Sequence, residues 1–231
     1  MSTLSICTIC QDEDELIGLW LDSCVHVYKY LKDDLKEVII VDGGSLDKTV
    51  EIINSYKDKL PLILIEYPFD TFGQQKNRGM EEATGDFIFY PDADITWTTN
   101  FPGTFKSGHY NSNNFWEFRV MTPVGDKYHI IKQNMGVTMR LWKRGPIYVT
   151  NFHEKLEGMI HKGKMCEYVF LFDNCLMQSD AKLMHRGERY QKFTEELVKE
   201  GMGPGPADRF YNARHTVEIV EMEDQYRKMV L

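Results

Sequence analysis

The chain has 231 residues, of which 42% are hydrophobic and 27% are charged, and its formal net charge is −8. This length and composition suit one domain with a sizeable core and argue against intrinsic disorder. The negative charge argues against a general nucleic-acid binder, which needs a cationic face. Its longest apolar runs, such as Val38–Val41 and Phe87–Tyr90, are far short of the roughly 20 residues of a membrane-spanning helix. No charged and then apolar leader opens the chain, so we expect a cytoplasmic protein.

The first 90 residues alternate predicted strands with predicted helices. Buried strands are predicted at Leu4–Cys10, Val38–Val41, Leu62–Glu66 and Phe87–Tyr90. Helices are predicted from Asp12, with Glu15 completing a capping box, from about Asp47 to Tyr56, and from Gln74 to Ala83. This order implies parallel strands joined by right-handed crossovers, and ligands of such sheets bind beyond the carboxyl ends of the strands.

The pattern changes after residue 110. Antiparallel strands are predicted at Phe115–Thr122, Tyr128–Ile131 and Gly136–Lys143. A helix is predicted at Ala181–Glu200, followed by a Gly/Pro-rich break at 200–206 and a last polar helix. We therefore expect a single domain over 1–231, with one half at about 1–110, a second at about 111–180 and a helical tail at about 181–231.

Five cysteines form no disulfide framework, but Cys7 and Cys10 make a CxxC. That motif can carry redox chemistry or half of a zinc site. Both residues lie in an apolar run, however, and no second CxxC completes a metal site. The sequence favours two small core residues.

Two acidic turns follow predicted strands. Asp92-Ala93-Asp94 places two carboxylates where they can hold a divalent metal against a diphosphate. About one such DxD is expected by chance, and Asp12-Glu13-Asp14 is another, so position favours the former. An ordinary acidic turn is the alternative.

The other turn is Asp42-Gly43-Gly44-Ser45. Its glycines let the backbone approach a ligand, and its carboxylate can accept an N–H of a nucleotide base. The alternative is a simple strand-to-helix turn that is capped by Ser45 or Asp47.

Taken in order, four segments resemble glycosyltransferase family 2: 4–13, 37–49, 73–94, and 140–154 with its Arg140-Leu-Trp142 and His153-Glu154. The resemblance implies the GT-A fold, a Rossmann-like α/β fold with a mostly parallel central sheet, an antiparallel acceptor-side portion and C-terminal helices. It also implies inverting transfer of a sugar from a nucleotide diphosphate to an acceptor.

The resemblance assigns roles to named residues of this chain. It places the nucleotide beside Thr8, Ile9, Cys10, Asp42, Gly44, Lys76, Arg78, Asp92 and Ala93. It places Mn²⁺ or Mg²⁺ on Asp92, Asp94 and His153, with His185 in reserve, and it makes Glu154 the catalytic base. The donor is expected to be a UDP-sugar, with UDP-glucose one candidate, and the acceptor is a glycan, lipid, protein or small molecule. A homodimer is possible.

Several of these assignments have a structural alternative. Lys76 and Arg78 would otherwise form the solvated face of a helix, and His153 would anchor a loop. Trp97, Trp116 and Trp142 are able to stack on a sugar but are more typical of a core. The chain also departs from the family, with Gly43 where many members have a second aspartate, Ile95 where one branch has glutamate, and no recognisable pattern beyond about residue 165.

Two other functions compete with sugar transfer. A nucleotidyltransferase shares this kind of fold, but it has a basic, glycine-rich loop where this chain has the acidic Gln11-Asp12-Glu13. A degenerate module that binds a nucleotide sugar without turnover stays open. A dinucleotide oxidoreductase is disfavoured, since no GxGxxG follows the first strand.

Overall fold

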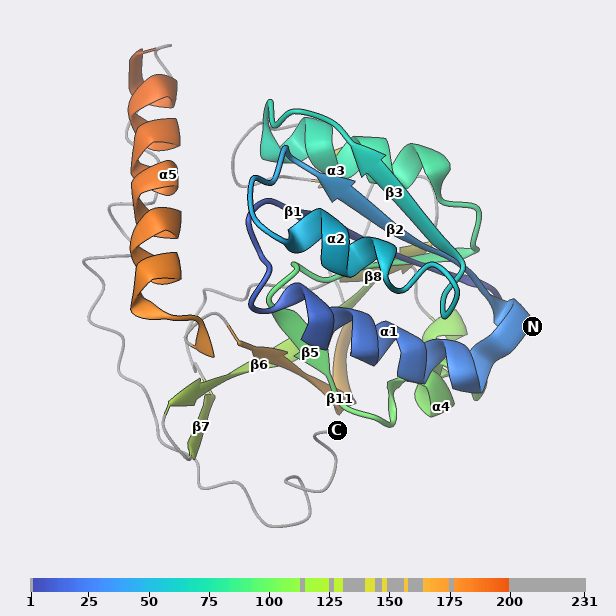
Figure 1. The fold of residues 1–231 in the computed structure, drawn as a ribbon. Coiled ribbons are helices and arrows are strands. Elements are labelled where there is room, and N and C mark those ends of the chain that lie inside the picture. The colour runs from blue at the N-terminus through green and yellow to red at the C-terminus, as the bar shows by residue number, and fades with distance from the viewer. Residues whose placement is uncertain are drawn as a thin grey trace.

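A computed structural model describes residues 2–112, 115–124, 127–130, 140–143, 147–148, 156–157, 164–174 and 177–199. A twisted nine-stranded sheet forms the centre, and helices cover both of its faces (Figure 1). One long helix, α5 (Asp180–Lys199), stands beside this body. The predicted α/β class is confirmed.

The N-terminal half of the sheet is parallel. Its strands are β1 (Leu4–Cys10), β2 (Leu35–Asp42), β3 (Leu62–Glu66) and β4 (Phe87–Tyr90), in the order β3-β2-β1-β4. Cys10 pairs with Asp42 at the carboxyl ends of β1 and β2. The parallel arrangement matches the prediction, although β2 begins three residues earlier than expected.

The other half of the sheet is mixed. Its strands are β5 (Ile95–Trp97), β6 (Phe115–Val124), β7 (Lys127–Ile130), β8 (Arg140–Lys143) and β11 (Lys164–Asp173). The order continues from β4 as β8-β6-β11-β5, with β7 on β6. Strand β8 is antiparallel to β6, as predicted, and also to β4, whereas β11 runs parallel to β6. A separate antiparallel pair joins β9 (Ile147–Tyr148) to β10 (Leu156–Glu157).

Helices pack on both faces of the sheet. The shorter ones are α1 (Ile17–Leu31), α2 (Thr49–Asn54), α3 (Phe72–Glu82) and α4 (Phe101–Lys106), with 3₁₀ turns at Lys32–Asp34 and His109–Ser112. One face carries α1, α2 and α4, and the other carries α3. The C-terminal helix α5 confirms the prediction over 181–200 to within one residue, while the predicted break and last helix lie outside the described residues.

The predicted start of the first helix is wrong. Asp12 has a φ of 57°, so it cannot cap a helix, and α1 begins at Ile17. A turn precedes it, in which the N–H groups of Leu16 and Ile17 donate to the carbonyl of Glu13 at 3.0 and 2.8 Å. The Glu15 carboxylate does not complete a capping box, because it accepts hydrogen bonds from the backbone N–H and hydroxyl of Ser179.

The boundaries of two other helices differ from the predicted ones by a few residues. Helix α2 begins at Thr49, whose N–H donates to the Asp47 carboxylate at 2.8 Å, and ends at Asn54. It is therefore shorter than the predicted 47–56. Helix α3 begins at Phe72, two residues earlier than predicted, because the Thr71 hydroxyl accepts the N–H of Gln74.

The larger core is rich in aromatic side chains. Trp97 and Trp116 are 5% and 0% exposed, so both belong to the core rather than to a sugar-stacking surface. The rings of Phe89 on β4 and Trp97 on β5 lie 5.0 Å apart, although β8, β6 and β11 stand between those strands in the sheet. The sheet therefore curls around this cluster.

Cys7 and Cys10 are buried in different core clusters on the two faces of β1. Burial raises the pKa of both thiols well above 9.0, and the Asp42 and Glu13 carboxylates add to the rise at Cys10. Neither thiol is poised to ionise at neutral pH, which agrees with the core interpretation of the CxxC.

Among the helices that the structure describes, none combines the length and the apolar character that crossing a membrane requires.

Candidate functional site

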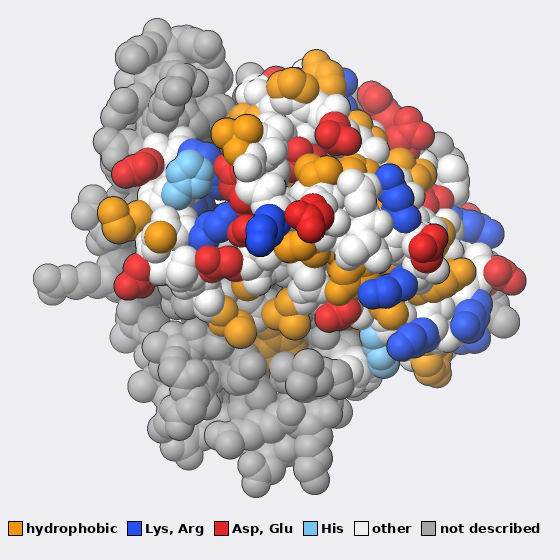
Figure 2. Space-filling model, viewed as in Figure 1, with side chains coloured by type: hydrophobic (Ala, Val, Ile, Leu, Met, Phe, Trp, Pro, Cys, Tyr) orange, Lys and Arg blue, Asp and Glu red, His pale blue; other side chains and the backbone are white. Residues whose placement is uncertain are grey.

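The loops that follow β1, β2 and β4 meet at one edge of the sheet, and α5 lies against them. The sequence placed the two acidic turns at this edge, and the structure confirms that position for Asp42 and for Asp92-Ala93-Asp94. In Figure 2, acidic and basic side chains intermingle where α5 meets the body. The edge is therefore a mixed-charge surface.

Asp94 is a buried carboxylate with a cationic partner. Its residue is 7% exposed, and its Oδ2 accepts a hydrogen bond from Nη2 of Arg186 at 2.7 Å. Burial raises the pKa of Asp94, the Arg186 guanidinium opposes the rise, and the Asp92 charge adds to it. The Asp94 backbone carbonyl also accepts two N–H groups of Asn174, at 2.9 and 3.0 Å. Asp94 is thus held in place through both its backbone and its side chain.

Asp92 and Lys76 form a more open pair beside Asp94. The Asp92 side chain is 39% exposed, and one of its oxygens lies 3.5 Å from Nζ of Lys76. Ala93 between the two aspartates is buried. The structure therefore brings Lys76 to the DxD turn.

This turn fits a divalent cation. Two carboxylates one residue apart supply the hard oxygen ligands that Mg²⁺ and Mn²⁺ prefer. The buried charge of Asp94 is of the kind that a cation stabilises. Within the described ranges, no group of three or more His, Cys, Asp and Glu side chains is arranged as a complete metal site. Both His153, the predicted third ligand, and Glu154, the predicted base, lie outside the described residues.

Asp42 organises the turn at the end of β2. Its Oδ2 accepts the N–H groups of Gly44 and Ser45 at 3.0 and 2.9 Å. Its Oδ1 accepts the Ser45 hydroxyl and lies 3.7 Å from the Cys10 sulfur. This network matches the turn alternative, and Asp42 would have to release one of these donors to accept a base N–H.

The two glycines of this turn differ in their surroundings. Gly44 has a φ of 94° and open space around its Cα, as a close ligand approach requires. A Cβ on Gly43 would lie 3.3 Å from Cβ of Phe69 and 3.4 Å from the carbonyl oxygen of Cys10. This crowding is a physical reason for glycine where many family members have aspartate.

The predicted wall of the nucleotide site at Thr8, Ile9 and Cys10 is the carboxyl end of β1, directly beside Asp42. Thr8 and Cys10 are buried and Ile9 is half-buried. The Cys10 carbonyl is already engaged, since it accepts the N–H of Gly43 at 2.8 Å.

Arg78 is placed differently from Lys76. Its guanidinium lies 3.4 Å from the centre of the Tyr67 ring and 3.6 Å from the Asp70 carboxylate. These contacts direct it to the loop between β3 and α3, whereas Lys76 is directed to Asp92.

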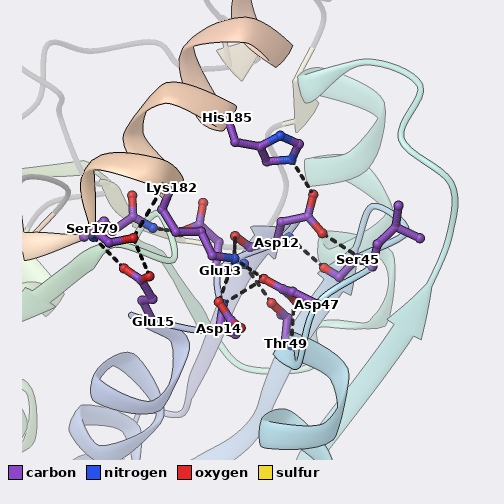
Figure 3. Close-up of polar contacts among 12 residues, drawn as sticks. Asp12, Glu13, Asp14, Glu15, Ser45, Asp47, Thr49, Ser179, Lys182 and His185 are labelled. Atoms are coloured by element: carbon purple, nitrogen blue, oxygen red, sulfur yellow. Dashed lines mark hydrogen bonds and ion pairs between the residues drawn. The ribbon is translucent and has the colours of Figure 1, made fainter.

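The sequence did not reveal that α5 presents a row of cations to the site. Lys182 inserts its Nζ between the carboxylates of Asp14 and Asp47, at 2.6 and 2.5 Å (Figure 3). His185, the reserve metal ligand, lies 3.3 Å from an oxygen of Asp12. The signal was present in the spacing of the basic residues 182, 186 and 189, which share one helix face. Which carboxylates they meet depends on the tertiary fold.

Asp12 also contacts Arg189, another of the basic residues on this face of α5. Nη1 of Arg189 donates to Oδ2 of Asp12 at 3.1 Å and to the carbonyl of Gln11 at 2.9 Å. The other oxygen of Asp12 accepts the N–H of Leu46 at 2.7 Å. Asp12 therefore joins the loops after β1 and β2 to α5.

Glu13 is a second buried carboxyl group next to Asp94. It accepts the side-chain amide of Gln178 at 2.9 Å, and Arg186 lies 3.8 Å away. Burial raises the pKa of Glu13 from 4.5 to about 7, with the Asp94 charge adding to the rise and the Arg186 charge opposing it.

Comparisons with known proteins agree with this geometry. Residues 5–103 match the model of glycosyl transferase family 2, which includes the strands and turns that carry Asp42 and Asp94. A TPR repeat-containing protein of Synechococcus elongatus is 36% identical over 94 residues, which are 41% of this chain and 21% of that protein. The probable glycosyltransferase YdaM of Bacillus subtilis is 32% identical over 98 residues, 40% of this chain and 23% of YdaM. The chain thus spans about a fifth to a quarter of the length of these relatives.

Among solved structures, S. aureus TarS 1–349 in complex with UDP-GlcNAc is similar with a TM-score of 0.52. It is 17% identical in sequence, and the match covers 62% of this chain and 45% of that one. This likeness concerns the fold. The resemblance seen in the first three segments of the sequence is confirmed: this chain carries a glycosyl transferase family 2 segment at residues 5–103, built on the GT-A fold.

Proposed function

We propose that the chain is a metal-dependent, inverting glycosyltransferase that takes a sugar from a UDP-sugar. The observation that carries the proposal is the DxD turn, where Asp94 is buried and Asp92 is half exposed beside Lys76, at the sheet edge where such folds bind nucleotides. The family match of residues 5–103 supports sugar transfer at this edge.

The roles follow from the positions of the side chains. Asp92 and Asp94 would hold Mn²⁺ or Mg²⁺, which when bound stabilises the negative charge of a departing diphosphate. Lys76 adds positive charge next to Asp92. The turn at Asp42, with its open Gly44, is proposed to bind the uracil ring. Arg78 is the weakest of the proposed nucleotide contacts, because its guanidinium is engaged by Tyr67 and Asp70.

The proposed base is Glu154, with His153 as third metal ligand; both assignments remain predictions from the sequence. In a single displacement the acceptor hydroxyl attacks the anomeric carbon while a carboxylate removes its proton, and this inverts the configuration. The acceptor is a glycan, lipid, protein or small molecule, and UDP-glucose and UDP-GlcNAc are the first donors to test.

The loop after β1 disfavours a nucleotidyltransferase. Asp12, Glu13 and Asp14 are acidic, and they face cations of α5 rather than forming a basic phosphate loop. A binding module without turnover is separated from an enzyme by measuring UDP release from UDP-sugars.

Calorimetry of UDP binding tests the proposal. With Mn²⁺ or Mg²⁺ the wild-type protein should bind UDP, and EDTA or Asp94→Asn should weaken binding about ten-fold or more, because a charge-assisted contact is lost. Asp33→Asn is the matched control, since Asp33 is exposed just before β2 begins, at the opposite end of that strand. UDP affinity that is the same with metal, with EDTA and in Asp94→Asn would exclude this site.

A further inference from the structure

Arg186 binds the Asp94 carboxylate, which the proposed function assigns to the metal. It comes from α5, 92 residues after Asp94, and its side chain is 38% exposed while that of Asp94 is 9% exposed. A buried carboxylate needs a counter-charge, and here the guanidinium supplies it. A divalent cation on Asp94 would also supply positive charge to this carboxylate and would repel the guanidinium beside it.

Neighbouring contacts keep Arg186 at the site when its partner changes. Lys182 is one helical turn before it and is held by Asp14 and Asp47. Arg189 is almost one turn after it and is held by Asp12. Both contacts are independent of Asp94, so α5 stays docked if Arg186 lets go of Asp94.

A diphosphate would bring the replacement partner. A guanidinium matches phosphate oxygens with paired N–H donors, and such charge-assisted hydrogen bonds are among the strong ones. A diphosphate bound through a metal on Asp92 and Asp94 would lie close to the Arg186 guanidinium, since Nη2 of Arg186 is 2.7 Å from Oδ2 of Asp94. The Arg186 guanidinium, once released from Asp94, would thus pair with the negatively charged diphosphate of the donor.

We propose that Arg186 is a partner-exchanging residue of the donor site: it neutralises Asp94 in the ligand-free protein and pairs with the donor diphosphate once a divalent cation takes Asp94. This inference rests on the proposed function and adds a positioning residue from the C-terminal helix to it. It predicts that loss of Arg186 has opposite effects on the affinities for metal and nucleotide, which a purely structural contact would not produce.

The test measures two affinities in the full chain. Binding of Mn²⁺ alone is followed by the loss of the free-ion spin-resonance signal, and binding of UDP at saturating Mn²⁺ by calorimetry. Arg186→Gln should bind Mn²⁺ about five-fold or more tighter than wild type, because a competing cation is removed. The same variant should bind UDP about ten-fold or more weakly, because a phosphate contact is lost.

Two further variants control the result. Lys57→Gln removes an exposed cation from the turn between α2 and β3, at the end of β3 away from the site, so its Mn²⁺ affinity should stay within about two-fold of wild type. Arg186→Lys keeps the charge and lacks the paired donors, so it should bind Mn²⁺ like wild type and UDP more weakly.

The outcomes separate this inference from the function on which it rests. If wild type binds UDP with Mn²⁺ and folded Arg186→Gln or Arg186→Lys matches it in both affinities, the exchange is refuted and the proposed function stands. If both affinities of Arg186→Gln fall together, Arg186 only supports the fold of the site. If wild type binds no UDP with any metal, the proposed function fails and the exchange fails with it.

Discussion

Glu13 is a buried carboxyl group whose pKa of about 7 in the folded protein exceeds its ordinary value of 4.5. Below about pH 4.5 both folded and unfolded chains hold the proton, so Glu13 costs no stability. As the pH rises toward 7 the unfolded chain releases the proton more readily, and the folded state loses stability until the loss is complete above about 7.

Glu13→Gln should therefore stabilise the protein at pH 8, by up to about 3 kcal/mol, and change little near pH 4.5. Urea unfolding at the two pH values measures this. Glu15→Gln is a control that should lower stability at pH 8, because hydrogen bonds from Ser179 lower the pKa of Glu15. If Glu13→Gln changed the free energy of unfolding equally at both pH values, the raised pKa of Glu13 would be contradicted.

Gly85 lies where the chain enters β4 against β1. A Cβ at this position would lie 2.6 Å from the backbone nitrogen of Ser5 and 2.7 Å from the carbonyl carbon of Leu4. Backbone atoms cannot yield as a flexible side chain does, so we expect Gly85→Ala to destabilise the fold by about 1–3 kcal/mol. Thermal unfolding measures the loss.

Gly18 offers the matched comparison. It lies in α1, where an added Cβ would meet only Cγ2 of Ile52 at 3.9 Å, an ordinary contact. Gly18→Ala should raise stability by roughly 0.5–1 kcal/mol through helix propensity. If the two substitutions changed stability equally, the crowding at Gly85 would not be the cause of the loss in Gly85→Ala.

Helix α5 is attached to the loops at the site through hydrogen bonds and ion pairs. Lys182, Arg186 and Arg189 make these contacts with side chains that are 18%, 38% and 29% exposed, while Met184 between them is 67% exposed. Salt screens such contacts, since the Debye length falls to about 3 Å at 1 M. Burial of apolar surface has no comparable sensitivity.

Hydrogen exchange should therefore show α5 amides exchanging faster at 1 M than at 0.05 M salt, while those of α1, which is buried in the core, change little. Lys182→Gln should give fast exchange in α5 already at low salt. Exchange in α5 that is slow and independent of salt would mean that apolar packing holds the helix.

The elements that the sequence predicted are those with a local signal. The strands β1 to β4 and the helix α5 carry strong apolar or helical patterns, and they were found within a few residues. Short elements were missed, among them β5, which has three residues, and α4, which contains Pro102 and Gly103. Strand β11 was missed although Tyr168–Phe172 is rich in strand-forming residues, since its partners β5 and β6 are distant in sequence.

At the scale of the whole molecule, the parallel arrangement of β1 to β4 was predictable from the sequence, and the closing of the sheet was not. Asp42 and Asp94 were placed at the correct edge because carboxyl ends of parallel strands share it. The curl of the sheet, which needs β5 to pair with β11, and the return of Arg186 to Asp94 depend on contacts between residues far apart in the sequence. No periodicity in the sequence encodes such contacts.

The attachment of Asp94 to later parts of the chain sets the order in which the site can form during synthesis. Its carbonyl is held by Asn174 and its carboxylate by Arg186, 80 and 92 residues downstream. At about 5–20 residues per second, a ribosome needs roughly 5–20 seconds to make that stretch. The parallel strands emerge well before it, so Asp94 of a nascent chain lacks these two partners until α5 has been made.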